Sequence, residues 1–182
     1  HVRMRPSVIE MPEGADVTFR NITLKYDEGT QADTDELVFI SNGNKLTFGE
    51  NVSFIKTGEA DNGYPTVYAG GNQIDAKTKG ELDIQSGTYT SVYGGNYNSD
   101  SSGKDAAVTI SKTATIKDTL SGGSDKEAGE VIKAQRTATI TINAITGNNN
   151  TLGVANVYNY DKLNVNGNLT VTNALNSENK AG

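Results

Sequence analysis

The segment Val67-Tyr68-Ala69-Gly70-Gly71-Asn72 decides the fold, because it returns as Val92-Tyr93-Gly94-Gly95-Asn96. A degenerate copy follows at 120–124, as Leu-Ser-Gly-Gly-Ser, and a fainter one lies at 154–158. Gly70 and Gly94 are 24 positions apart, and Gly94 and Gly122 are 28 apart. A repeat of this length is typical of one coil of a solenoid.

Short segments in which apolar and polar residues alternate return at the same interval. Alternation with a period of two predicts half-buried β-strands. The first set lies at 16–19, 45–48, 81–84, 107–110, 138–142 and 162–165. Most of these are followed, after a short polar corner, by a second strand, as at 21–24, 51–55, 113–116 and 168–171.

A β-hairpin would explain any single corner of this kind, such as Ser86-Gly87 or Asn166-Gly167. It would not explain why the same type of strand returns about six times at coil-length intervals. We therefore predict an all-β fold, a single right-handed parallel β-helix (β-solenoid) of about six coils. The inward positions of its strands are expected to form one column of Val, Ile, Leu and Phe.

The ends of the chain differ from the repetitive part. Residues 1–13 are expected to form a lead-in or cap, in which 7–13 adds a covering strand, because a solenoid needs protected ends. Residues 14–176 are expected to form the β-helix, and 177–182 a polar tail. Because the sequence starts without Met and ends without an apolar cap, we expect a piece of a longer protein, with the solenoid continuing past residue 182.

Composition excludes several classes of function. Lys and Arg number 16 and Asp and Glu 22, so the net charge is −6, which argues against a nucleic-acid partner or an anionic membrane surface. The chain has no Cys, and its single His is residue 1, so thiol and imidazole chemistry are nearly excluded. No apolar run approaches the roughly 18 residues of a membrane span, so no membrane insertion is expected. The oligomeric state is not predictable from these features.

The Val-Tyr-Gly-Gly-Asn corners, together with Leu82-Asp83-Ile84-Gln85-Ser86-Gly87-Thr88-Tyr89 ahead of one of them, carry a resemblance. They resemble the pectin-lyase-like right-handed parallel β-helix domains of bacterial surface proteins, including adhesin-like proteins of Gram-positive organisms. The resemblance covers roughly residues 14–176, the scale at which solenoid repeats are recognised. It implies an elongated module outside the cell or on its surface, facing carbohydrate or a partner, and it carries over no catalytic residues.

These features favour a non-enzymatic structural or adhesive module that binds a glycan or a host-surface protein. The alternative is a carbohydrate-active enzyme domain of the polysaccharide lyase or hydrolase type, which needs paired carboxylates or a base on one face. Asp83 alternates with Leu82 and Ile84 and is predicted to point outward, where Lys112 and Lys117 from a later coil are candidates to pair with it. We favour an ordinary solvated strand face here.

The tyrosines near the Gly-Gly corners are candidate ligand contacts, because an exposed aromatic ring can stack on a sugar. The candidate binding residues are Tyr68, Tyr93, Tyr97 and Asp100. For Tyr68 and Tyr93 we favour a buried stack of one ring on the other, since stacked coils place equivalent residues in register. Tyr97 opens the polar segment 97–105, which contains Asp100, and is expected to be exposed.

The sequence offers two further candidate ligands, calcium and ice. Asp33, Asp35 and Glu36 cluster in one segment and are the candidate site for calcium, and no other cofactor is expected. No EF-hand spacing is present, so a soluble acidic loop is favoured. Alternating threonines, as at 137–141, also suggest the regular hydroxyl array of an ice-binding solenoid, but outward charges such as Asp83 and Lys45 interrupt it. Ice binding therefore ranks below adhesion.

Overall fold

The computed structural model describes residues 2–4, 8–27, 37–57, 63–73, 78–98, 105–125, 137–146 and 148–176. The regular structure of these residues is almost entirely β-strand, and the one helical element among them is a short 3-10 turn, η1, at Asn148–Asn150. Every ladder between the described strands is parallel. The prediction of an all-β fold is therefore confirmed, and the hairpin alternative is wrong for these strands, because a hairpin pairs its strands antiparallel.

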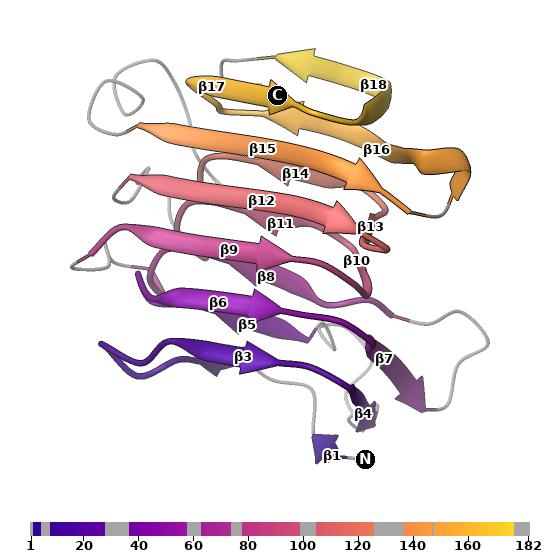
Figure 1. The fold of residues 1–182 in the computed structure, drawn as a ribbon. Coiled ribbons are helices and arrows are strands. Elements are labelled where there is room, and N and C mark those ends of the chain that lie inside the picture. Colours follow the sequence, from indigo (N-terminus) through magenta and orange to yellow (C-terminus); the bar gives the residue numbers. More distant parts are fainter. Residues whose placement is uncertain are drawn as a thin grey trace.

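Two large sheets lie face to face (Figure 1). The front sheet has six strands: β3 (Val17–Phe19), β6 (Lys45–Phe48), β9 (Gly80–Ile84), β12 (Ala106–Lys112), β15 (Ala138–Ile145) and β17 (Lys162–Val165). The rear sheet has seven: β2 (Val8–Glu10), β5 (Val38–Ile40), β8 (Thr66–Tyr68), β11 (Val92–Tyr93), β14 (Thr119–Ser121), β16 (Thr151–Tyr158) and β18 (Asn168–Asn176). In both, the strands stack in chain order.

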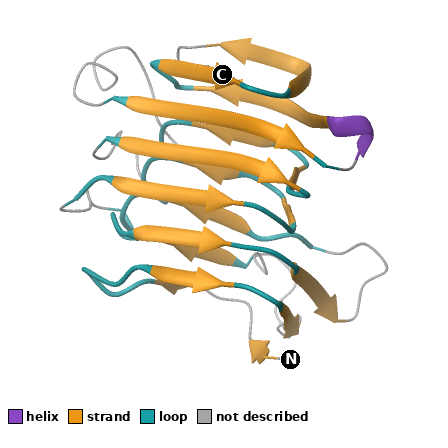
Figure 2. Cartoon of the chain, viewed as in Figure 1, coloured by secondary structure: helices purple, strands orange, loops and turns teal. Residues whose placement is uncertain are grey.

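Two smaller sheets lie at the side where the chain leaves the front sheet. One contains β1 (Val2–Met4), β4 (Ile22–Asp27) and β7 (Val52–Thr57), and the other contains β10 (Thr88–Tyr89) and β13 (Thr115–Ile116). Within the described residues the chain passes twice from the front sheet through this side to the rear sheet, in β9, β10 and β11 and again in β12, β13 and β14 (Figures 1 and 2). This arrangement is consistent with a β-solenoid.

The repeated Val-Tyr motif lies in register on the rear sheet. Val67 pairs with Val92, which pairs with Leu120, and Tyr68 pairs with Tyr93. The Gly-Gly corners follow directly after these strands. The spacing of the motif in the sequence therefore corresponds to the step from one strand of the rear sheet to the next.

The core fills the space between the two large sheets. Residues from the front sheet form continuous inward rows because each strand pairs with its neighbour without a shift over these positions: Leu46, Leu82, Val108 and Ile140 in one row, and Phe48, Ile84, Ile110 and Ile142 in the next. All eight are buried. Phe39, Val67, Val92, Leu120 and Val157 belong to the same core from the rear sheet. The outward positions of these strands are consequently free to carry polar side chains.

Two strands near the start of the chain, β1 and β2, each pair with a later strand. β2 lies in the segment predicted to form a covering strand and pairs with β5. β1, which the sequence did not predict, pairs with β4. At the other end, Val165 and Leu175 on β17 and β18 are the most exposed of the large apolar residues that the structure describes, at 43% and 55%.

Candidate functional site: a polar hollow on the front sheet

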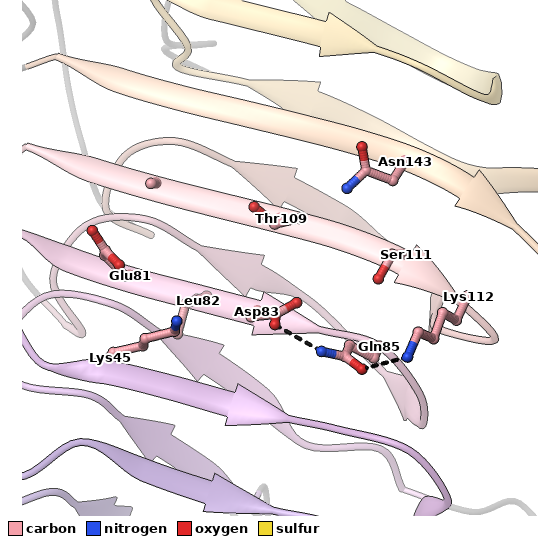
Figure 3. A pocket seen from close by; sticks show the side chains of 10 residues that line it. Lys45, Glu81, Leu82, Asp83, Gln85, Thr109, Ser111, Lys112 and Asn143 are labelled. Carbon is pink, nitrogen blue, oxygen red and sulfur yellow. Dashed lines mark hydrogen bonds between the residues drawn. The ribbon is translucent and has the colours of Figure 1, made fainter.

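A shallow hollow of about 350 Å³ lies on the outer face of the front sheet (Figure 3). It extends over β6, β9, β12 and β15 and includes Gln85, just after β9. Its lining is almost wholly polar: Lys45, Glu81, Leu82, Asp83, Gln85, Ala107, Thr109, Ser111, Lys112 and Asn143. Only Leu82 and Ala107 have purely apolar side chains, and Leu82 belongs to the core.

Strand alternation places these side chains on the outer face. Along β9 and the residue after it, Glu81, Asp83 and Gln85 are half-buried, whereas Leu82 and Ile84 between them are buried. Asp83 pairs with Thr47 below and Thr109 above, so an acid stands between two hydroxyls in one outward row. The outward orientation predicted for Asp83 is confirmed.

A chain of hydrogen bonds runs along one side of the hollow. Gln85 Nε2 donates to Asp83 Oδ2 at 2.8 Å, and Lys112 Nζ donates to Gln85 Oε1 at 2.9 Å (Figure 3). The same ammonium forms an ion pair with Glu50 Oε1 at 2.8 Å. The pairing anticipated between Asp83 and Lys112 is thus indirect, because Gln85 lies between them.

The ion pair determines the protonation of Glu50. The hydrogen bond from Lys112 and the charge of its ammonium hold the pKa of Glu50 below its usual value. Both side chains are about half exposed, so water screens the pair and its contribution to stability is small. Its importance is geometric, since one ammonium holds together Glu50, Gln85 and, through Gln85, Asp83.

The opposite side of the hollow has a different charge pattern. Glu81 forms an ion pair with Lys79 at 3.5 Å, and both side chains are about half exposed. Lys45 pairs with Glu81 along the ladder, and its backbone N–H donates to Asp16 Oδ1. Among the described residues, neither ion pair on this face includes the Lys45 ammonium. The hollow therefore offers a cation that is available to a ligand.

The outward threonines do not form an uninterrupted array. Thr18 and Thr47 are paired, as are Thr109 and Thr141, but Asp83 separates the two pairs. Lys45 and Glu81 flank the row. A hydroxyl lattice suited to ice would continue across this position, so the geometry counts against that alternative.

The predicted tyrosine contacts lie on the opposite side of the molecule. The rings of Tyr68 and Tyr93 are stacked, as expected, with centroids 4.9 Å apart and planes at 9°, but Tyr93 is half-buried rather than buried. Tyr68 is buried, and its hydroxyl donates to Asp125 Oδ2 at 3.2 Å. Together with Val38 and Ile40 these tyrosines form a packed cluster on the outer face of the rear sheet.

Tyr97 differs from its prediction, because it is half-buried rather than exposed. Its ring meets that of Tyr68 edge-on, with centroids 5.1 Å apart. The backbone explains this: Tyr97 N–H donates to Gly71 O, and Gln73 N–H donates to Tyr97 O. These bonds fix the start of segment 97–105 against the Gly-Gly corner and turn the ring onto the cluster.

Lys117 also lies away from Asp83. Its ammonium is over the ring of Tyr64, 5.6 Å from the centroid.

The remaining candidates lie outside the described residues. They are Asp33, Asp35 and Glu36 for calcium and Asp100 for ligand binding. Within the described part of the chain, no three acidic or histidine side chains are grouped in a way that would hold a metal ion, and no helix is long and apolar enough to span a membrane.

Sequence reasoning missed most of the lining of the hollow. Glu81, Gln85, Thr109 and Lys45 meet there because β6, β9 and β12 are aligned in register, and that register depends on loops of unequal length. The signal available in the sequence was the outward position of each residue in its own alternating strand.

Comparisons with known protein families, curated proteins and solved structures return no match for this chain, so the function is argued from the geometry of the site.

Proposed function

We propose that this chain is a non-enzymatic structural and adhesive module, located outside the cell or on its surface, which binds carbohydrate in the hollow of the front sheet. In this proposal the chain winds as a single right-handed β-helix of the pectin-lyase-like type, with about six coils. The parallel ladders support a helical winding, and crossovers between parallel strands are nearly always right-handed. A host-surface glycan, free or attached to a protein, is the proposed partner.

The observation that carries the proposal is the mixture of hydrogen-bonding groups in the hollow. A sugar hydroxyl both donates and accepts, so a glycan site must offer both kinds of partner. Asp83 and Glu81 accept, Lys45 donates, and Thr109, Ser111 and Asn143 do both. The side chains stand on paired strands rather than on loops, which holds their spacing constant and lowers the entropic cost of binding.

Retention of the protein on immobilised polysaccharides tests this proposal. Replacing a group that bonds to the ligand costs about 1.5–3 kcal/mol when a charge is involved, so Asp83→Ala should weaken retention by roughly tenfold or more. Thr109→Val, which keeps the shape and removes the hydroxyl, should weaken it less. The matched control is Asn164→Ala, an exposed outward residue on β17 beyond the hollow. Equal retention of all three variants would contradict the proposal.

One observation favours the second candidate, a polysaccharide lyase or hydrolase. Glu81 and Asp83 are two residues apart on one strand and line the same hollow, and glycoside hydrolysis needs two carboxylates around one bond. A lyase would need a base, for which Lys112 and Lys45 are the candidates. Release of new reducing or unsaturated ends by the wild type, abolished in Glu81→Gln and Asp83→Asn, would establish this alternative in place of the first.

A further inference from the structure

A second hollow lies where the side of the molecule changes from one small sheet to the other. It has a volume of about 380 Å³ and is lined by Val52, Ser53, Phe54, Tyr64, Gly87, Thr88 and Thr113. None of these residues lines the hollow on the front sheet. The two hollows therefore form separate candidate sites.

A break in strand pairing creates this hollow. β7 is the last strand of its sheet and β10 the first of the next, and no ladder joins them among the described strands. At the corner, Ser86 takes over part of the pairing, because its hydroxyl accepts from Val52 N–H and donates to Gly49 O. Gly87 has a positive φ of 95°, which directs the chain away from β7. The gap left between the two strands is the hollow.

Tyr64 provides the aromatic wall of this hollow. Thr90 fixes its backbone, with Oγ1 donating to Tyr64 O at 2.7 Å, and the Lys117 ammonium lies over its ring. A cation over the face of a tyrosine stabilises that ring orientation. Tyr64 as a whole residue is half-buried, and it lines the hollow.

Hydroxyl groups surround the aromatic wall. Ser53 Oγ shares a hydrogen bond with Thr23 Oγ1 at 2.9 Å, which leaves it capacity for another. Within the described part of the chain, the hydroxyls of Thr88 and Thr113 have no protein partner, and both residues line the hollow. An aromatic face with a rim of unengaged hydroxyls matches a pyranose ring, which is apolar on its C–H faces and polar at its edge.

We propose that the hollow of Tyr64, Thr88 and Thr113 is a second carbohydrate site, which binds one pyranose unit by stacking on Tyr64 and by hydrogen bonds to the two threonines. The ligand class rests on the proposed carbohydrate binding, but the site is distinct from the front-sheet hollow. Lys117 acts as a positioning residue for the Tyr64 ring. The front-sheet hollow has no aromatic side chain in its lining, so only the second site stacks on a sugar.

Backbone amide NMR shifts test the two sites separately. The labelled protein is titrated with cellohexaose as a neutral probe and a hyaluronan hexasaccharide as an acidic one. We expect at least one of the two probes to shift the amide signals of Ser53, Gly87, Thr88 and Thr113. Tyr64→Ala should raise the dissociation constant obtained from these shifts by roughly tenfold, because an aromatic contact contributes up to about that factor in affinity. Tyr64→Phe should keep the affinity of the wild type. The spectra themselves show whether each variant is folded.

The matched control is Thr109→Val in the other hollow, which should leave binding at Tyr64 unchanged. Shifts confined to Asp83, Thr109 and their neighbours would overturn the second site and leave the proposed function standing. Shifts confined to the Tyr64 hollow would support the second site and overturn the front-sheet site. Unaltered binding at this hollow in Tyr64→Ala would overturn the stacking role, and no shifts at either hollow with both probes would overturn both proposals.

Discussion

Tyr68 and Tyr93 occupy equivalent positions on β8 and β11, with their rings stacked 4.9 Å apart. The separation equals the usual distance between neighbouring strands of a sheet, so the rings follow the backbone spacing without adjustment. Each tyrosine is followed within two residues by a buried glycine, Gly70 or Gly94. The stacking of side chains therefore ends directly at a corner where backbone approaches backbone.

Gly94 is expected to tolerate no side chain. A Cβ there would lie 2.6 Å from Gly122 O and 3.0 Å from Ala106 Cβ. Gly94→Ala should consequently lower the free energy of unfolding by about 1–3 kcal/mol, the range for overpacking in a core. Gly153→Ala is the control, because nothing lies within 4 Å of its Cβ position. Urea unfolding curves of the two variants measure the difference, and equal stabilities would contradict the close packing of the corners.

Shortening a side chain in one of the inward rows should lower the stability of the protein strongly. Ile84 is fully buried in the row between Phe48 and Ile110. Ile84→Ala should lower the free energy of unfolding by about 2–5 kcal/mol. Thr109→Ala, on the outer face of the adjacent strand, should change it by less than about 0.5 kcal/mol. Similar losses in both variants would mean that the two faces of the front sheet are wrongly assigned.

The burial of Tyr89 should make the protein less stable at alkaline pH. It is fully buried beside Phe48 and Phe54, and burial raises its pKa well above the usual value. Above pH ~10 the unfolded chain loses the phenol proton while the folded chain keeps it, so the free energy of unfolding falls with pH. Below that pH the contribution is constant.

Urea unfolding at pH values on either side of about 10 measures this effect. Tyr89→Phe should show a shallower decline, although it also loses the hydrogen bond from the Tyr89 hydroxyl to Ser86 O. The slope, rather than the absolute stability, is the informative quantity. An unchanged slope in Tyr89→Phe would contradict the burial of an unionised phenol at this position.

Lys112 is expected to control the ionisation of Glu50. Replacing it in Lys112→Met removes the hydrogen bond and the positive charge, so the pKa of Glu50 should rise toward its usual value. Because the pKa is lowered in the folded chain, the pair stabilises the fold above the unfolded pKa and loses this effect as pH falls. NMR titration of the side-chain carboxylate measures the shift. The shift should also shrink at high salt, since the pair is exposed.

Much of the architecture could be predicted from residues that repeat. Val67 and Val92 are in register, as the repeated motif implied, and β6 and β17 have their predicted bounds. The reason is physical, since alternation marks the inward face and Gly-Gly marks the corners where only a small residue fits. Asp83 points outward for the same reason. These features are local in sequence, so the sequence alone suffices to place them.

Features that depend on the path between strands could not be predicted. β1 has only three residues, too few for a pattern of alternating apolar and polar residues to be recognised. Tyr97 is half-buried because backbone hydrogen bonds to Gly71 and Gln73 hold it against the Gly-Gly corner. The side position of Tyr64 follows from the break between β7 and β10, which no residue pattern marks. The contact of Lys112 with Glu50 joins residues 62 positions apart. It depends on the register of β6, β9 and β12 in the front sheet.

The most direct test of the account measures bound and cleaved glycan in one incubation. The protein is mixed with a panel of acidic and neutral polysaccharides, with and without calcium, and retained polysaccharide is quantified together with new chain ends. We predict that the wild-type protein retains at least one polysaccharide and produces no new chain ends. The retained amount should be lower for Asp83→Ala. New reducing or unsaturated ends would contradict the non-enzymatic function, and no retention of any polysaccharide would contradict carbohydrate binding itself.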